Sequence, residues 1–205
     1  IKEKRGYKVK MNRLKKQVEF IKEIDKLKYI FRQSALISDG RKENSAEHSW
    51  HVGVMAMLLT EYVEQDNVDL LKVIKMLMIH DVVEIDAGDT FIYDEEGYKD
   101  KEEREIKAAE RIFNLLPSDQ ADEIWQLWRE FEERETPEAL YAASLDRLQP
   151  LLLNYFTEGH TWKMPGVTSD KVYERMEPIR KSTPVLWEHV AEILEDSIKK
   201  GYLKR

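Results

Sequence analysis

The sequence has no cysteine, only eight glycines and six prolines, and no long apolar run. Without cysteine, the chain can form neither a disulfide nor a thiolate zinc site, which is consistent with a reducing cytosol. No stretch approaches the roughly 18 apolar residues of a membrane span. The first residues, 1–5, lack the apolar core of a signal peptide. We therefore expect a cytoplasmic protein with no membrane partner.

Positive charge is in deficit, since the net charge is −7 over 205 residues. This balance argues against broad binding of a nucleic acid polymer, although a local basic pocket for a small phosphate is compatible with it. We interpret residues 1–10 as a basic tail that is mobile or an expression tag, and not as a nucleic-acid arm. A chain of this length can form one good core, so residues 11–205 are expected to be a single domain.

Turn signals separate a series of helical patterns, and no strand alternation of useful length is found. The sequence thus predicts an all-α, single-domain helical bundle. Asn44 or Ser45 is expected to cap the second helix, with Glu47 completing a capping box. Pro150 should kink or break the helix that carries it. The expected helices span about 11–31, 45–65, 68–85, 101–116 and 118–134, and others begin at Pro137, near Ser169 and at Pro184.

A histidine and an aspartate stand side by side at His80 and Asp81, directly after the apolar run 74–79. Burying such a pair costs several kcal/mol unless a cation or another partner compensates. A bound metal ion would provide that compensation.

Two further polar groups occur in apolar surroundings. His48 is in line with Val52, Met55 and Leu59 at helical spacing, so its imidazole should face the core. Asp146 lies in a helical pattern whose neighbouring positions are mostly small or apolar. Both side chains are therefore expected to point inward.

Each of these residues has a simpler interpretation when taken alone. A single histidine on an apolar stripe is more often a hydrogen-bonded core residue, and a lone aspartate within a helix is usually part of a structural ion pair. A helical protein without metal therefore stays open as an alternative. Taken together, two imidazoles and two carboxylates suit one divalent transition ion, namely Mn, Co, Fe, Ni or Zn.

The order His48, His80-Asp81, Asp146 resembles the H…HD…D signature of the HD-domain metal-dependent phosphohydrolases. The likeness extends to the Gly88-Asp89 step, which resembles that of bacterial 5'-deoxynucleotidases. The resemblance covers roughly residues 20–200. It implies an HD-type helical domain in which the four residues bind metal.

The resemblance also implies that Glu84 and Asp89 are the acidic groups that handle the attacking water. Glu84 lies four residues after His80, which on a helix is one turn further along the same face, so it is our candidate for the general base or for a group that orients the water. Asp89 follows Gly88, which permits a turn back toward the site. The alternative for Asp89 is a turn or capping carboxylate.

The remaining histidines narrow the type of site. HD enzymes with two ions have further histidines between the HD pair and the last aspartate, whereas here none occurs between His80 and His160. A site for one ion is therefore expected. We interpret His51 as packing or as orienting a ligand, His160 as facing solvent in a loop, and His189 as lying on a helix surface.

The phosphate needs a cationic partner besides the metal, and arginine can bind it with two hydrogen bonds. The candidates are Arg32, Arg41, Lys42 and Arg147. In the deoxynucleotidase family an arginine about fifteen residues before the first histidine contacts the substrate, and Arg32 precedes His48 by sixteen. We predict Arg32 and Arg147 as substrate-binding residues.

The sequence therefore predicts a metal-dependent phosphomonoesterase that acts on nucleoside 5'-monophosphates or another small phosphate. The nearest alternative is a hydrolase of nucleotide di- or triphosphates. A further alternative is a ligand-sensing protein that keeps the fold without turnover. The resemblance also implies a homodimer.

Overall fold

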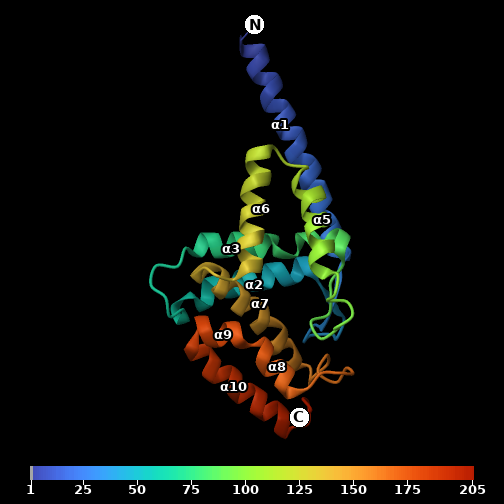
Figure 1. Cartoon of the computed structure of the whole chain (residues 1–205), viewed down its shortest axis with the longest axis vertical. Coiled ribbons are helices and arrows are strands. Elements are labelled where there is room, and N and C mark those ends of the chain that lie inside the picture. The colour runs from blue at the N-terminus through green and yellow to red at the C-terminus, as the bar shows by residue number, and fades with distance from the viewer. Residues whose placement is uncertain (1) are drawn as a thin grey trace.

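A computed structural model describes residues 2–205 (Figure 1), and side chains are described from Tyr7 onward. The chain forms an assembly of helices, as predicted, with one small hairpin. In chain order the α-helices are α1 (Lys2–Ile24), α2 (Ser45–Leu59), α3 (Leu70–Ile79), α4 (Glu84–Ala87), α5 (Lys101–Phe113), α6 (Ser118–Glu133), α7 (Pro137–Phe156), α8 (Ser169–Arg175), α9 (Glu177–Ser182) and α10 (Pro184–Lys199). Short 3-10 helices follow α1, α2 and α3 as η1 (Asp25–Tyr29), η2 (Thr60–Tyr62) and η3 (His80–Val83).

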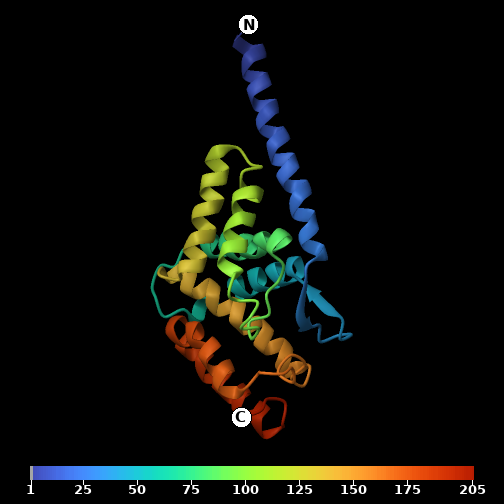
Figure 2. The ribbon, with the colours of Figure 1, turned by 45° about the vertical axis from the view of Figure 1, so that its right-hand side comes forward.

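The first helix differs from its predicted span of 11–31. It begins at Lys2, ends at Ile24, and extends away from the rest of the molecule (Figures 1 and 2). We propose a boundary at residue 10 between the basic tail and the helical domain. The helix runs through this boundary, and residues 6–10 are exposed. Among residues 2–205, no helix combines the length and the apolar character that crossing a membrane requires.

The all-α prediction is confirmed, but the sequence did not indicate one small hairpin. Strand β1 (Phe31–Ala35) pairs with β2 (Lys42–Asn44) in antiparallel fashion. The two strands are five and three residues long, too short for an alternating pattern to stand out. The hairpin is important for the site because β1 carries Arg32.

Helix α2 begins as predicted. The Asn44 side chain accepts a hydrogen bond from the Glu47 amide at 2.9 Å, and the Glu47 carboxylate accepts one from the Asn44 amide at 3.1 Å. This capping box fixes the first residue of the helix and thereby places His48 in the first turn.

A single helix over 68–85 was predicted, and this prediction is wrong. Helix α3 ends at Ile79, where φ is −117°, and η3 and the short helix α4 follow. His80 and Asp81 therefore lie in a 3-10 turn, and Glu84 begins a new helix. The sequence suggested that His80 and Glu84 are one α-helical turn apart. The backbone between them instead forms a 3-10 helix, which is wound more tightly than an α-helix.

Helix α7 runs without a break from Pro137 through Pro150 to Phe156, so Pro150 does not end it. Because proline has no N–H, the carbonyl of Asp146 lacks its usual partner four residues later. Helix α7 packs against α2, α3, α6 and α9, and Figure 2 shows it crossing the middle of the molecule. Fully buried residues such as Val52, Leu77, Tyr141 and Leu145 fill the core between these helices.

Candidate metal centre

The four predicted ligands come together between helices α2, η3 and α7. His48, His80, Asp81 and Asp146 are all buried. One ligand atom from each of His48, His80 and Asp146 lies within 4.8 Å of the other two. A carboxylate oxygen of Asp81 lies 3.0 Å from Nε2 of His80. Three side chains that are up to 98 residues apart in sequence thus surround one small volume, and Asp81 adjoins it beside His80.

Hydrogen bonds orient the two imidazoles. Nδ1 of His48 lies 3.0 Å from the Gln149 amide oxygen, and Nδ1 of His80 lies 2.9 Å from the carbonyl oxygen of Leu77. Both oxygens are acceptors, so both Nδ1 atoms donate, and each neutral ring presents the lone pair of Nε2. The lone pair of His48 faces Asp146 Oδ1 at 3.0 Å, and that of His80 faces Asp81 Oδ1.

Nitrogen lone pairs that face carboxylate oxygens require a cation between them. Nε2 of His80 is buried and has no hydrogen-bond partner, although Asp146 Oδ1 is 3.6 Å away. Nitrogen and oxygen ligands bind zinc-like ions at about 2.0–2.2 Å, so two neighbouring ligand atoms lie about 3 Å apart. The distances in this cluster fit a divalent transition ion.

A proton can take the place of the ion at His80. Burial works against the imidazolium, but the carboxylates of Asp81 and Asp146 prevail and raise the pKa of His80 to about 9. For His48, burial and the positive charge of Arg32 lower the pKa, so this ring is neutral. Although burial opposes it, the Arg147 guanidinium and both imidazoles hold the pKa of Asp146 well below its usual range.

A second set of side chains supports His48. Gln149 donates from Nε2 to Glu43 at 2.7 Å while its oxygen accepts from His48, and His51 lies 3.2 Å from the same Nε2. This agrees with an orienting role for His51. Neither Gln149 nor Glu43 was predicted from the sequence. Gln149 could have been found as a lone amide between apolar residues three positions after Asp146, whereas Glu43 stands among polar neighbours and gives no such signal.

Arg32 reaches the cluster from strand β1. Its Nη1 lies 2.7 Å from Asp81 Oδ2 and 4.0 Å from Asp89, and its Nη2 lies 4.0 Å from Asp146. Burial disfavours the charged guanidinium, but Asp81, Glu84 and the other carboxylates more than offset it and raise the pKa of Arg32. Arg32 thus acts as the counter-ion of the carboxylates.

Glu84 and Asp89 line the same pocket. Glu84 is buried and accepts a hydrogen bond from Ser45 Oγ at 2.7 Å. Gly88 has φ +75° and ends α4, so the chain turns and places Asp89 near Arg32. Burial, with the nearby charge of Asp81, raises the pKa of Glu84 well above its ordinary value, and burial likewise raises that of Asp89.

A cavity of about 120 Å³ opens beside the cluster. This is well above the ~10–15 Å³ that one water molecule needs. Residues of the polar loop 88–100 form part of its wall, as the sequence suggested, with Phe91, Tyr93 and Tyr98 supplying aromatic surface. Two arginines, Arg134 and Arg147, also line it. The sequence analysis missed Arg134, which stands in a run of charged residues typical of a solvated helix end.

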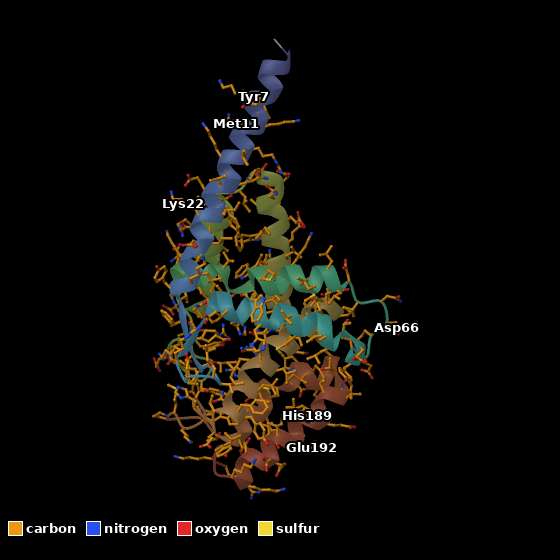
Figure 3. The ribbon with its side chains drawn as sticks, turned by 180° about the vertical axis from the view of Figure 1, so that it is seen from behind. Tyr7, Met11, Lys22, Asp66, His189 and Glu192 are labelled. Carbon is orange, nitrogen blue, oxygen red and sulfur yellow. The ribbon has the colours of Figure 1, made fainter. Side chains whose placement is uncertain are left out.

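The other candidates lie outside this pocket. Arg41 pairs with Glu47 at 2.7 Å and is half exposed. His160 is exposed in its loop. His189 lies on α10 beside Glu192, as the view from behind in Figure 3 shows, and its side chain is 66% exposed. The surface interpretation of His189 is therefore confirmed.

Comparisons with known proteins agree with this geometry. A family model described as HD domain matches residues 24–187. The chain belongs to the HD-domain family. A crystal structure of a predicted metal-dependent phosphohydrolase from Magnetospirillum magnetotacticum is 52% identical, superposes with a TM-score of 0.90, and the match covers 94% of this chain and 96% of that one. The predicted resemblance to the HD-domain phosphohydrolases is confirmed.

The chain is also similar to curated proteins named 5'-deoxynucleotidase HDDC2. The protein of Dictyostelium discoideum is 30% identical over 76% of this chain and 82% of its own length. The human protein is 27% identical over 66% of this chain. The match spans 65% of the human protein, just under two thirds of its length.

Gln149 offers a test of the orientation of His48. We expect Gln149→Ala to lower the affinity for the divalent ion by about 10–100-fold, because His48 loses the hydrogen bond that fixes its ring. Titration calorimetry with Mn²⁺ or Co²⁺ measures the change. The control is Gln126→Ala on the exposed side of α6, which should bind metal as the unchanged protein does. Equal affinities in all three proteins would contradict the assigned role.

Proposed function

We propose that this HD-domain protein hydrolyses the phosphomonoester of nucleoside 5'-monophosphates. The observation that carries this proposal is the cluster of His48, His80 and Asp146, beside a pocket that is lined by further acidic side chains and by arginines. The relatives named 5'-deoxynucleotidase support this choice of substrate.

We assign the proposed metal ligands as His48, His80, Asp81 and Asp146, which would hold one divalent transition ion. When bound, such an ion makes water more acidic and polarises the phosphorus centre. The identity of the ion, among Mn, Co, Fe, Ni and Zn, follows availability as much as ligand type.

In the proposed reaction, water attacks phosphorus and the bond from phosphorus to the 5' oxygen breaks. Glu84 accepts the proton of the water. Burial, with the nearby charge of Asp81, raises the pKa of Glu84 well above its ordinary value, which makes this carboxylate a stronger proton acceptor. Asp89, whose pKa is also raised, can hold a proton and give it to the leaving oxygen. We propose that Arg32 and Arg147 also contact the substrate. Each would donate hydrogen bonds from the guanidinium N–H groups that do not bond to Asp81 or Asp146.

Product analysis tests the proposed reaction. Protein stripped of metal and reloaded with Mn²⁺, Co²⁺, Ni²⁺, Fe²⁺ or Zn²⁺ is incubated with nucleoside 5'-monophosphates and, in parallel, with nucleoside triphosphates. We expect orthophosphate and nucleoside from the monophosphates. Pyrophosphate or tripolyphosphate as the main product would instead favour the di- or triphosphate hydrolase. No turnover with any metal would favour the sensing protein.

The separate roles of Asp81 and Glu84 give another prediction. We expect Asp81→Ala to lose both metal and activity, because a ligand is removed. Glu84→Ala should keep the metal and lose about 10²–10⁴-fold in kcat, the usual contribution of a general base. Metal content by elemental analysis and kcat are measured on the same samples. Equal metal loss in both variants would show that Glu84 acts as a ligand.

We also propose a homodimer in the cytoplasm, with helix α1 in the contact. Apolar residues recur on α1 at alternating steps of four and three, at Tyr7, Met11, Leu14, Val18 and Ile21. This spacing is typical of a helix that packs along a second helix. Tyr7 is 68% exposed and Ile21 62% exposed, and Figure 3 shows Tyr7 and Met11 on the part of α1 beyond the body. A second copy could cover the same stripe around a two-fold axis.

Mass in solution checks the dimer. Light scattering should give about twice the chain mass of 24.3 kDa. Changing Leu14 and Val18 together to Glu should halve that mass, because charges on the stripe cannot be buried without partners. Lys16→Glu lies off the stripe and serves as the control. A monomer before any substitution would reject the proposal.

A further inference from the structure

Three arginines line the pocket, and they differ in how their charges are balanced. Arg32 is tied to Asp81 at 2.7 Å, with two more carboxylates at 4.0 Å. Arg147 is bonded to Asp146 at 2.8 Å. Among residues 6–205, by contrast, no carboxylate oxygen lies within 4.0 Å of the guanidinium of Arg134.

The side chain of Arg134 has no hydrogen bond within the described part of the chain. Its Nε is inaccessible to solvent and has no partner. Burial and the positive charge of Arg147 lower the pKa of Arg134, and the more distant carboxylates of Glu132 and Asp146 offset only part of this effect. An unpaired buried donor and a cation without a close ion pair are both costly unless a ligand satisfies them. An anion in the pocket would do so.

The backbone of Arg134 is strained as well. The residue closes α6 with φ +54° and ψ 34°, in the left-handed region that glycine adopts most easily. Its amide still bonds the carbonyl of Glu130 at 3.1 Å. Glycine would satisfy this helix end without steric cost, so the arginine side chain is not needed to end the helix. Strained residues of this kind concentrate where the side chain serves a site.

We propose that Arg134 is a substrate-binding residue that contacts the phosphoryl oxygens of the substrate, with Arg147 beside it. This inference rests on the proposed function, since it takes the phosphomonoester as the anion in the pocket. Arg32 has an unpaired Nε too, but its charge already serves the carboxylates. Arg134 is the pocket arginine with no ion pair among the described residues.

The test uses metal-loaded protein and the variant Arg134→Gly, with two measurements. The first is the affinity for inorganic phosphate by titration calorimetry, which needs no turnover. The second is KM and kcat for a nucleoside 5'-monophosphate. We expect the phosphate Kd and KM both to rise about 10–100-fold, the usual loss for a charge-assisted hydrogen bond, with kcat changed less than about 3-fold. Tm should stay the same or rise, because glycine fits the left-handed conformation.

Two further variants sharpen the result. Arg134→Lys keeps the charge and should recover part of the lost affinity. Arg129→Gln, which removes an exposed arginine of the same helix that pairs with Glu133 at 3.1 Å, should leave Kd and KM unchanged. Unchanged Kd and KM in Arg134→Gly would overturn the inference, as would a loss of affinity that merely follows lost metal or lowered Tm.

Failure of the proposed function has a different signature. If the unchanged protein binds inorganic phosphate and Arg134→Gly does not, while neither hydrolyses monophosphates, then Arg134 binds an anion as inferred and the proposed reaction is wrong. If the unchanged protein hydrolyses monophosphates and Arg134→Gly matches it in KM, then the reaction stands and the role of Arg134 is wrong.

Discussion

The concentration of buried negative charge is the constraint on which this structure depends. Asp81, Glu84, Asp89 and Asp146 line one pocket, and two unit charges 4 Å apart repel by about 4 kcal/mol at an effective dielectric constant of 20. The fold offsets part of this charge with Arg32, and burial together with the charge of Asp81 raises the pKa values of Glu84 and Asp89. What remains is concentrated between the imidazoles and Asp146, where a divalent ion fits.

The irregular parts of the fold lie where this charge has to be arranged. The 3-10 turn η3 carries the His-Asp pair, and Gly88 with its positive φ returns Asp89 to the pocket. Pro150 removes a helical hydrogen bond beside Asp146, and the hairpin brings Arg32 across the cluster. The regular helices α2, α3 and α7 form the apolar core, and the departures from them position the polar groups.

The features that could be predicted from the sequence are those that residues within one or two helical turns determine. His48 and its capping box were predictable because periodicity and caps act within one or two turns, and the neighbouring His-Asp pair is unusual by itself. The 3-10 turn was missed because the apolar pattern continues through it. The contacts of Gln149 with His48 join segments 101 residues apart, and the left-handed backbone of Arg134 leaves no trace in residue type. Such features depend on tertiary packing, which periodicity does not reveal.

The three pocket arginines differ in how free they are to bind the substrate. Arg32 and Arg147 each neutralise a ligand carboxylate, so they can offer a phosphate only the N–H groups that the carboxylates leave unused. Arg134, without an ion pair among residues 6–205, has no such restriction. The left-handed backbone and the unpaired Nε of Arg134 both disfavour folding, and the folded protein already contains both before substrate binds. A donor that is already desolvated and held in place binds its anion with less reorganisation, which is the advantage that a preorganised site has over a flexible one.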